Sequence, residues 1–155
     1  NIRLKRFDPA AEFSRAFPEQ QETVQLFQDL YDSDVMPASR SDLQRLVLLN
    51  NYGGLWMDSD MLMVQSLASL VNEDWAYLGQ RNFINGAALS VSRPRSPFAK
   101  ALLVTIAARG IAAAEDSNIY KFGPALLGKL REEAGTAGTF HVLPTCFFDG
   151  AWEQA

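Results

Sequence analysis

The sequence predicts a single α/β domain over residues 1–155, in which a mostly parallel sheet is flanked by helices. Segments whose apolar residues recur at helical spacing alternate with short, wholly apolar runs that are typical of buried strands. Alternation of this kind favours parallel strands that carry helices on their faces. The chain has 155 residues, 48% of them hydrophobic, which is enough for one substantial core and too few to promise two.

The charge balance argues against one class of partner. A formal net charge of -4, without any run of clustered lysines or arginines, is unsuited to a nucleic-acid backbone. No apolar stretch approaches the roughly 18 residues that span a bilayer, and no signal segment opens the chain. We therefore expect no nucleic acid, no membrane span in the visible chain and a cytoplasmic protein, with peripheral membrane contact left open. The single cysteine, Cys146, is expected to be a small core residue.

The first third of the chain is expected to be scaffold. Residues 2–7 alternate apolar and basic side chains, which predicts a strand that ends at Pro9. Pro18 suits the first position of a helix whose apolar residues follow three-and-four spacing. Asp32 and Asp34 come after that helix and form an Asp-x-Asp segment, for which we predict a solvated loop rather than a site.

Residues 41–60 join a helix, a turn, a strand and two carboxylates in one short segment. Ser41 is expected to cap the start of the helix, and the apolar residues after it share one helical face. Gly53-Gly54 supplies the stop that a helix C-terminus favours. The apolar run 55–57 predicts a buried strand of the parallel type, which places Asp58 and Asp60 at its carboxyl end.

Asp58 and Asp60 need compensation if they lie close together, because like charges repel each other and lose hydration. Ligands of open α/β sheets bind beyond the carboxyl ends of the strands, where these two residues are expected. Carboxylate oxygens suit Mg²⁺ or Mn²⁺, which keep water and substrate phosphates as their other ligands. A divalent metal with a diphosphate is therefore the predicted occupant.

Asp42 and Arg45 lie three residues apart, on adjacent positions of one helix face. Spacing alone favours a surface ion pair, which contributes roughly 0 to 1 kcal/mol. Trp56 and Met57, on the strand before the carboxylates, are expected to fill the core.

The later elements continue the alternation. A strand is predicted over residues 75–78, and Asn85-Gly86 is an ordinary hairpin-turn pair from which another strand returns. Ser96 predicts the cap of a helix that ends at Gly110. A last strand is predicted over residues 139–143. It contains the sole histidine, His141, for which we expect a solvent-facing position because no second histidine stands at ligand spacing.

Three features in this order resemble the DXD sugar-binding region of retaining glycosyltransferases: Ser41-Asp42-x-x-Arg45, Tyr52-Gly53-Gly54 and Asp58-x-Asp60. That family includes initiating mannosyltransferases, capsular-polysaccharide sugar transferases and, more distantly, the glucosylating clostridial toxins. The resemblance covers about residues 37–143 and implies the nucleotide-sugar-binding GT-A fold.

The resemblance also implies an activity. A member of this family moves a sugar from a nucleoside-diphosphate donor, here a UDP- or GDP-sugar, to a hydroxyl on a saccharide, lipid or protein acceptor. Mn²⁺ or Mg²⁺ is the implied cofactor. Retention of anomeric configuration is expected, by a front-face mechanism in which the departing phosphate helps to deprotonate the acceptor.

Site roles follow from the same resemblance. Asp42 is expected to contact sugar hydroxyls and Arg45 to support the donor. Asp58 is expected to meet the ribose or the donor sugar, and Asp60 to coordinate the metal that bridges the diphosphate. These two aspartates are the predicted catalytic residues.

Further contacts are implied at three later positions. Asn85 lies in the family's second signature, so a donor contact and a plain hairpin turn both remain possible there. Gly123 opens a glycine-proline helix start whose amides face the cleft in relatives, although a core helix without a ligand accounts for it equally well. Asp149 is expected to complete the metal shell, and Trp152 to cover the donor.

Relatives begin with an additional strand and loop that hold the nucleotide base, whereas this sequence starts at Asn1. We therefore expect the domain to be truncated at its N-terminus. A non-catalytic sugar- or partner-binding module is one alternative. An aspartate-nucleophile phosphotransferase of the haloacid-dehalogenase type is another, because Asp58-x-Asp60 follows an apolar strand. Leu62 opposes it, since that motif prefers threonine or valine at this position.

Overall fold

The computed structural model describes residues 3–34, 36–63, 65–79, 83–115, 118, 121–133 and 140–148. In this part of the chain the helices are α1 (Pro9–Ala16), α2 (Gln21–Ser33), α3 (Pro37–Tyr52), α4 (Pro97–Arg109), α5 (Ala112–Glu115) and α6 (Pro124–Glu133). The strands are β1 (Gly54–Met57), β2 (Trp75–Leu78), β3 (Ile84–Val91) and β4 (His141–Leu143), and a 3₁₀ helix, η2, covers Thr145–Phe147. The predicted α/β class is confirmed.

The described strands form one sheet in the order β1-β3-β2-β4. β3 runs antiparallel to both of its neighbours, β1 and β2, whereas β2 and β4 are parallel. β1, β2 and β4 therefore point one way and β3 points the other. The prediction of a mostly parallel sheet is wrong for these pairings, because two of the three are antiparallel.

The length of one connection explains this difference. Only residues 79–83 separate β2 from β3, and a parallel crossover needs about a dozen residues or more. β3 must therefore return antiparallel to β2. The connection between β1 and β2 is longer, and these two strands share a direction on either side of β3.

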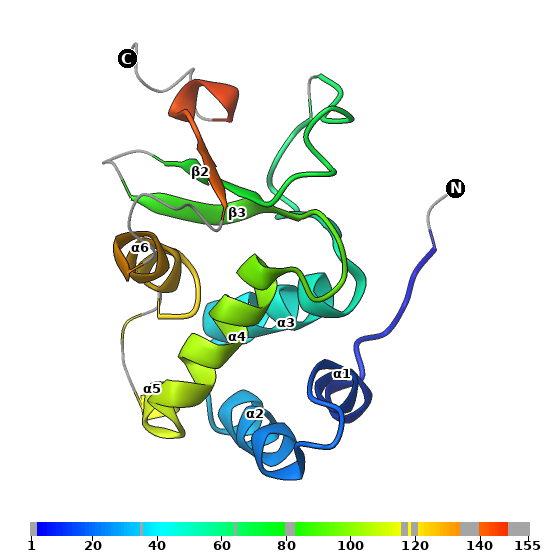
Figure 1. Ribbon diagram of the computed structural model, residues 1–155, viewed down its shortest axis with the longest axis vertical. Coiled ribbons are helices and arrows are strands. Elements are labelled where there is room, and N and C mark those ends of the chain that lie inside the picture. The colour runs from blue at the N-terminus through cyan, green and yellow to red at the C-terminus, as the bar shows by residue number, and fades with distance from the viewer. Residues whose placement is uncertain are drawn as a thin grey trace.

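The helices gather on one side of the sheet (Figure 1). α3 packs on β1 and β3, α6 packs on β3, and α4 lies against both of these helices. α1 and α2 pack against that layer from the side away from the sheet. The main hydrophobic core fills the space between these layers, with fully buried side chains that include Phe13, Phe27, Val47, Leu89, Phe98 and Ile106.

The opposite face of the sheet has a smaller aromatic cluster. Trp75 and Tyr77 point to this face and Ala76 between them points to the main core, as expected for alternating side chains of a strand. The ring of Phe148 lies 5.4 Å from that of Trp75 and 4.5 Å from that of Tyr77, centroid to centroid. Segments that follow β1 and β4 therefore cover the face of the sheet that the helices leave open.

The helix before β1 starts earlier than its sequence suggests. α3 begins at Pro37, whose fixed backbone suits the first helical position, so the prediction of Ser41 as the cap is wrong. The predicted stop is confirmed. Gly53 has a φ of 67°, and a Cβ there would lie 3.0 Å from the backbone carbon of Arg93, so both conformation and space favour glycine.

The N-terminal segment differs from the prediction. Residues 3–8 form neither helix nor strand, so the strand predicted over residues 2–7 is wrong for that part of it. Pro9 begins α1 rather than ending a strand, and the Asp8 carboxylate caps this helix by accepting the amide of Ala11 at 3.2 Å. An aspartate followed by a proline is typical of a helix start. The prediction gave more weight to the alternating pattern of residues 2–7.

Asn85-Gly86 lies inside β3 and not in a hairpin turn. The register between β2 and β3 shifts here, because Ala76 pairs with Leu89 whereas Tyr77 pairs with Asn85. The side chain of Asn85 accepts the amide of Ala87 at 3.0 Å, a local bond that stabilises the bulge. The turn was predicted because Asn-Gly is common in hairpin turns, but the same pair also occurs in β-bulges.

Three further predictions have clear outcomes. Cys146 is exposed rather than buried. His141 is exposed as predicted. Asp34 is buried, with 1% of its side chain exposed, and forms an ion pair with Lys121, so the predicted solvated loop is wrong for this residue. Among the described residues, no helix combines the length and apolar character that a bilayer crossing requires.

Candidate functional site

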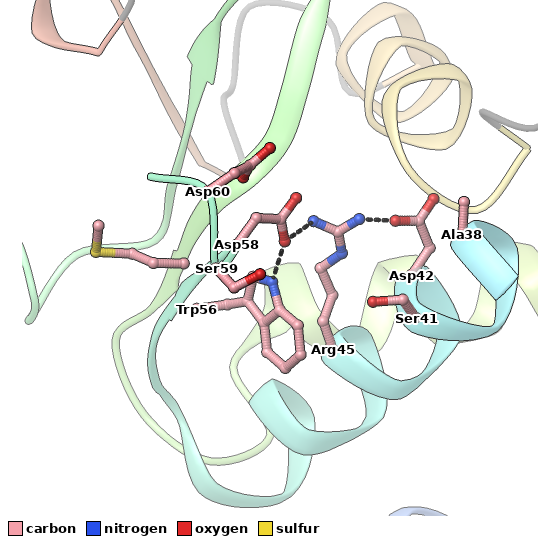
Figure 2. Close-up of a pocket in the computed structure, with 9 residues that line it drawn as sticks. Ala38, Ser41, Asp42, Arg45, Trp56, Asp58, Ser59 and Asp60 are labelled. Carbon is pink, nitrogen blue, oxygen red and sulfur yellow. Dashed lines mark hydrogen bonds and ion pairs between the residues drawn. The ribbon is translucent and has the colours of Figure 1, made fainter. Parts of the chain in front are cut away.

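A pocket of about 550 Å³ opens between α3, the end of β1 and the turn that follows β1. Figure 2 shows the side chains that line it, with Asp42 and Arg45 coming from α3 and Asp58 and Asp60 from beyond β1. The lining residues are Ala38, Ser41, Asp42, Arg45, Trp56, Met57, Asp58, Ser59 and Asp60. The structure therefore brings together the two segments on which the sequence prediction depended.

Helical geometry places Asp42 and Arg45 side by side. They are three residues apart on α3, and an oxygen of the Asp42 carboxylate pairs with Nη2 of Arg45. Their side chains are only 7% and 8% exposed. The surface ion pair that spacing alone suggested is instead a buried one.

Arg45 connects three separate elements through its guanidinium group. Besides Asp42 on its own helix, Nη1 donates to Oδ1 of Asp58 at 3.3 Å and to the backbone carbonyl of Gly86 in β3. The bulge in β3 leaves that carbonyl outside the regular ladder with β2. Arg45 therefore holds α3, the turn after β1 and the bulge of β3 in one arrangement.

Burial and charge act in opposite directions on Arg45. Desolvation lowers the pKa of its guanidinium from the ordinary value, and the negative charge of Asp58 raises that pKa. The Nε–H group of Arg45 is buried and has no hydrogen-bond partner among the described residues. One cation thus serves two carboxylates and keeps one donor unused.

Asp58 is held in place from several directions. Its Oδ1 accepts the indole N–H of Trp56 at 2.7 Å, and its amide donates to the carbonyl of Ala87 in β3 at 2.8 Å. The guanidinium carbon of Arg45 lies 5.8 Å from the centre of a Trp56 ring. Trp56 also packs against the main core, so the core role predicted for it describes only one of its surfaces.

Asp60 is exposed, unlike the other carboxylates of the pocket. Figure 2 shows its side chain outside the Arg45 network, and neither of its oxygens has a partner among the described residues. Oδ2 of Asp58 is likewise without a partner in the described part of the chain. With three carboxylates and one arginine, the pocket carries a net negative charge that would attract a cation.

The carboxylate oxygens of this pocket fit a divalent cation that needs few protein ligands. Among the described residues no group of three or more histidine, cysteine, aspartate or glutamate side chains could enclose a metal. The available set is Asp60 with the free oxygen of Asp58. Mg²⁺ and Mn²⁺ accept such a set, because they take one or two carboxylates and complete their shell with water and phosphate. Zn²⁺ in a closed protein cage is a poor match.

The remaining predicted residues lie around the pocket rather than on its surface. Gly123 precedes α6 and touches the back of Asp42, since a Cβ at Gly123 would lie 2.5 Å from Oδ2 of Asp42. The side chain of Asn85 is used within the β3 bulge. Asp149 and Trp152 lie outside the described residues.

Two contributors to the site were not identified from the sequence. The carbonyl of Gly86 carries no side-chain signal, and only the bulge directs it to Arg45. Trp56 could have been recognised, because side chains alternate along a strand and Trp56 must point to the face that α3 covers.

Comparisons with known proteins give one match. Residues 8–77 match the family described as glycosyltransferase sugar-binding region containing DXD motif. This range includes α3, β1, Asp42, Arg45 and both aspartates of Asp58-x-Asp60. No curated protein sequence and no solved structure matches the chain at a significant level.

Proposed function

We propose that this chain, whose residues 8–77 match the glycosyltransferase sugar-binding region containing a DXD motif, transfers a sugar from a nucleoside-diphosphate donor to a hydroxyl acceptor. The donor is a UDP- or GDP-sugar, and Mn²⁺ or Mg²⁺ takes part. The GT-A-like fold expected from the sequence belongs to this proposal. Its support is a layer of helices on one face of a mixed sheet, with the pocket beyond the end of β1.

One observation carries the proposal: Arg45 is held between Asp42 and Asp58 in a pocket where Asp60 has no partner among the described residues. Asp60 would hold the metal, and a bound divalent cation supplies charge stabilisation to the diphosphate leaving group.

The chain's own side chains bind and orient the donor in this proposal. Asp42 accepts hydrogen bonds from sugar hydroxyls with the oxygen lobes that Arg45 leaves available. Arg45 fixes the orientation of Asp42 through their ion pair. Asp58 meets the ribose or the sugar while its other oxygen stays bonded to Arg45 and Trp56.

Asn85 and Gly123 act on the donor through the residues next to them. Asn85 stabilises the bulge that presents the carbonyl of Gly86 to Arg45. Gly123 lets α6 approach Asp42, because any larger residue would displace that carboxylate. Asp149 remains a proposed further ligand of the metal.

Retention of anomeric configuration is part of the proposal. No carboxylate of the pocket stands out as a covalent nucleophile, since Asp42 and Asp58 both pair with Arg45. A front-face reaction, in which the leaving phosphate takes the proton of the acceptor hydroxyl, needs no covalent nucleophile from the protein.

Ligand-induced stabilisation tests the proposal, because a ligand that binds only the folded state raises the melting temperature. The protein is melted with Mn²⁺ alone, with UDP or GDP alone, and with each combination. We expect a rise that needs metal and nucleotide together, and that identifies the base.

Two charge-matched variants make this test specific. Asp60→Ala removes the exposed carboxylate of the pocket, and Asp32→Ala removes an exposed carboxylate elsewhere. The rise should be lost in Asp60→Ala and kept in Asp32→Ala. A folded wild-type protein without any shift for either nucleotide would contradict the transferase and favour a binding module that lacks the nucleotide site.

A further inference from the structure

Asp34, in the segment Asp32-x-Asp34, forms a buried ion pair that the proposed mechanism does not use. Nζ of Lys121 lies 2.9 Å from Oδ2 of Asp34, and both side chains are 1% exposed. Stability alone is a weak reason for such a pair, because desolvation of two charges offsets most of their attraction. Fixing one arrangement of the surrounding chain is the better-attested role of buried ions.

Asp34 lies where two helices join. It ends α2, and its other oxygen, Oδ1, accepts the amide of Met36 at 2.9 Å. Met36 is the residue from which α3 starts, and it offers no side-chain cap of its own. The carboxylate of Asp34 therefore fixes the start of the helix that carries Asp42 and Arg45.

Lys121 lies on the opposite side of the same carboxylate. It begins the turn over residues 121–123 that leads into α6, and its backbone carbonyl accepts a hydrogen bond from Arg109 of α4 at 2.9 Å. Gly123, at the end of this turn, lies against the Asp42 carboxylate so closely that a Cβ would be 2.5 Å from Oδ2. The turn thus forms the wall that Asp42 rests on.

We infer that Asp34 and Lys121 are positioning residues for the donor site: their ion pair joins the start of α3 to the turn before α6 and so sets the Asp42 carboxylate against Arg45. This inference rests on the proposed function for the identity of the donor. The geometric claim, that the ion pair sets the Asp42–Arg45–Asp58 arrangement, stands apart from any ligand.

The test uses a variant that removes the charges without leaving one unpaired. Lys121→Met alone would bury an unpaired carboxylate and could simply unfold the protein. The double variant Asp34→Asn, Lys121→Met removes both charges. It also keeps an oxygen at position 34 to accept the amide of Met36. We expect it to fold, because a buried pair can often be replaced by uncharged residues with little loss of stability.

Two readouts report on the pocket. The first is the side-chain N–H signals of Trp56 and Arg45 in ¹H–¹⁵N spectra of the ligand-free protein, since the Trp56 indole donates to Asp58 and Asp58 pairs with Arg45. The second is the Kd of the metal–nucleotide donor. In the double variant we expect both signals to move and the Kd to rise, by up to about a hundredfold for a misplacement near 1 Å.

Glu12→Gln is the matched control, because Glu12 anchors the far end of α3 through Asn51 and Tyr52. It should alter stability while both signals and the Kd stay unchanged. A folded double variant with wild-type signals and a wild-type Kd would overturn the inference. If the wild type binds no donor, the proposed function fails, and the two signals still decide whether the ion pair positions the pocket.

Discussion

Asp32-x-Asp34 and Asp58-x-Asp60 are the same three-residue pattern placed in opposite surroundings. The first lies at the end of α2, and Asp34 is buried against Lys121 with 1% of its side chain exposed. The second follows β1 and lies in an open pocket, where Asp58 shares Arg45 with Asp42 and Asp60 stays exposed. Asp34 has a lysine to itself, whereas the three carboxylates of the pocket have one arginine among them.

In the proposed function, the capacity of each segment to bind a cation depends on what the surrounding chain leaves unpaired. Asp34 is neutralised by a lysine and has no room for a ligand, so it serves the architecture. Asp60 has neither a cation nor a hydrogen-bond donor among the described residues. A metal ion with phosphate ligands would supply the positive charge that Asp60 lacks.

The largest effect on stability is expected at the buried segment. Lys121→Met leaves the Asp34 carboxylate buried without its cation, which should lower the free energy of unfolding by about 3 to 5 kcal/mol. Urea denaturation measures this. A loss below about 1 kcal/mol, as for an exposed pair, would show that Asp34 is hydrated and would remove the contrast between the two segments.

A smaller loss of stability is expected where the two regions meet. Gly123→Ala places a Cβ 2.5 Å from Oδ2 of Asp42, and overpacking of this kind costs about 1 to 3 kcal/mol. It should also weaken donor binding, because Asp42 must move relative to Arg45. Gly128→Ala in α6 is the control, since a Cβ there would meet nothing within 4 Å. Equal donor affinities in the two variants, measured by calorimetric titration, would contradict the close contact at Asp42.

Arg45→Lys is expected to act mainly on function and on its pH dependence. A lysine cannot reach Asp42, Asp58 and the Gly86 carbonyl together, so donor affinity should fall. Burial lowers the pKa of Arg45, and the same burial would lower a lysine from a starting value of about 10.4. The cation is present below its pKa and lost above it, so the variant should lose donor affinity as pH rises, in a range where the wild type does not. Parallel pH profiles of the two proteins would contradict this.

The smallest effect on stability is expected at Asp60. Its carboxylate is exposed and unpaired in the described chain, so Asp60→Ala should change the free energy of unfolding by no more than about 0.5 kcal/mol. Thermal denaturation without metal measures this. A marked gain in stability would indicate that the repulsion among the pocket carboxylates is stronger than the exposure of Asp60 suggests.

Much of the site could be predicted because its signals are local. The order of α3, the Gly53 stop, β1 and the aspartates is written in consecutive residues, and helical spacing alone puts Asp42 beside Arg45. The strand over residues 75–78 and the helix from Ser96 to Gly110 also follow from local patterns.

What could not be predicted depends on partners distant in the chain. Nothing near Asp34 indicates Lys121, so a solvated loop was the natural prediction for a polar residue after a helix. The direction of β3 depends on where this strand begins, and the sequence predicted a turn at Asn85-Gly86, which lies inside it. Asn85-Gly86 carries the signature of a turn, and only the pairing of β3 with both β1 and β2 shows that it serves as a bulge.

The most direct test of the account is donor turnover by the wild type, Asp60→Ala and Asp32→Ala, measured with Mn²⁺ as release of sugar from a UDP- or GDP-sugar. We predict turnover by the wild type and by Asp32→Ala, and a loss of at least about a hundredfold in Asp60→Ala, as expected when several kcal/mol of charge stabilisation disappear. Full activity in Asp60→Ala, or an equal loss in Asp32→Ala, would contradict the claim that Asp60, which has no partner among the described residues, serves the reaction.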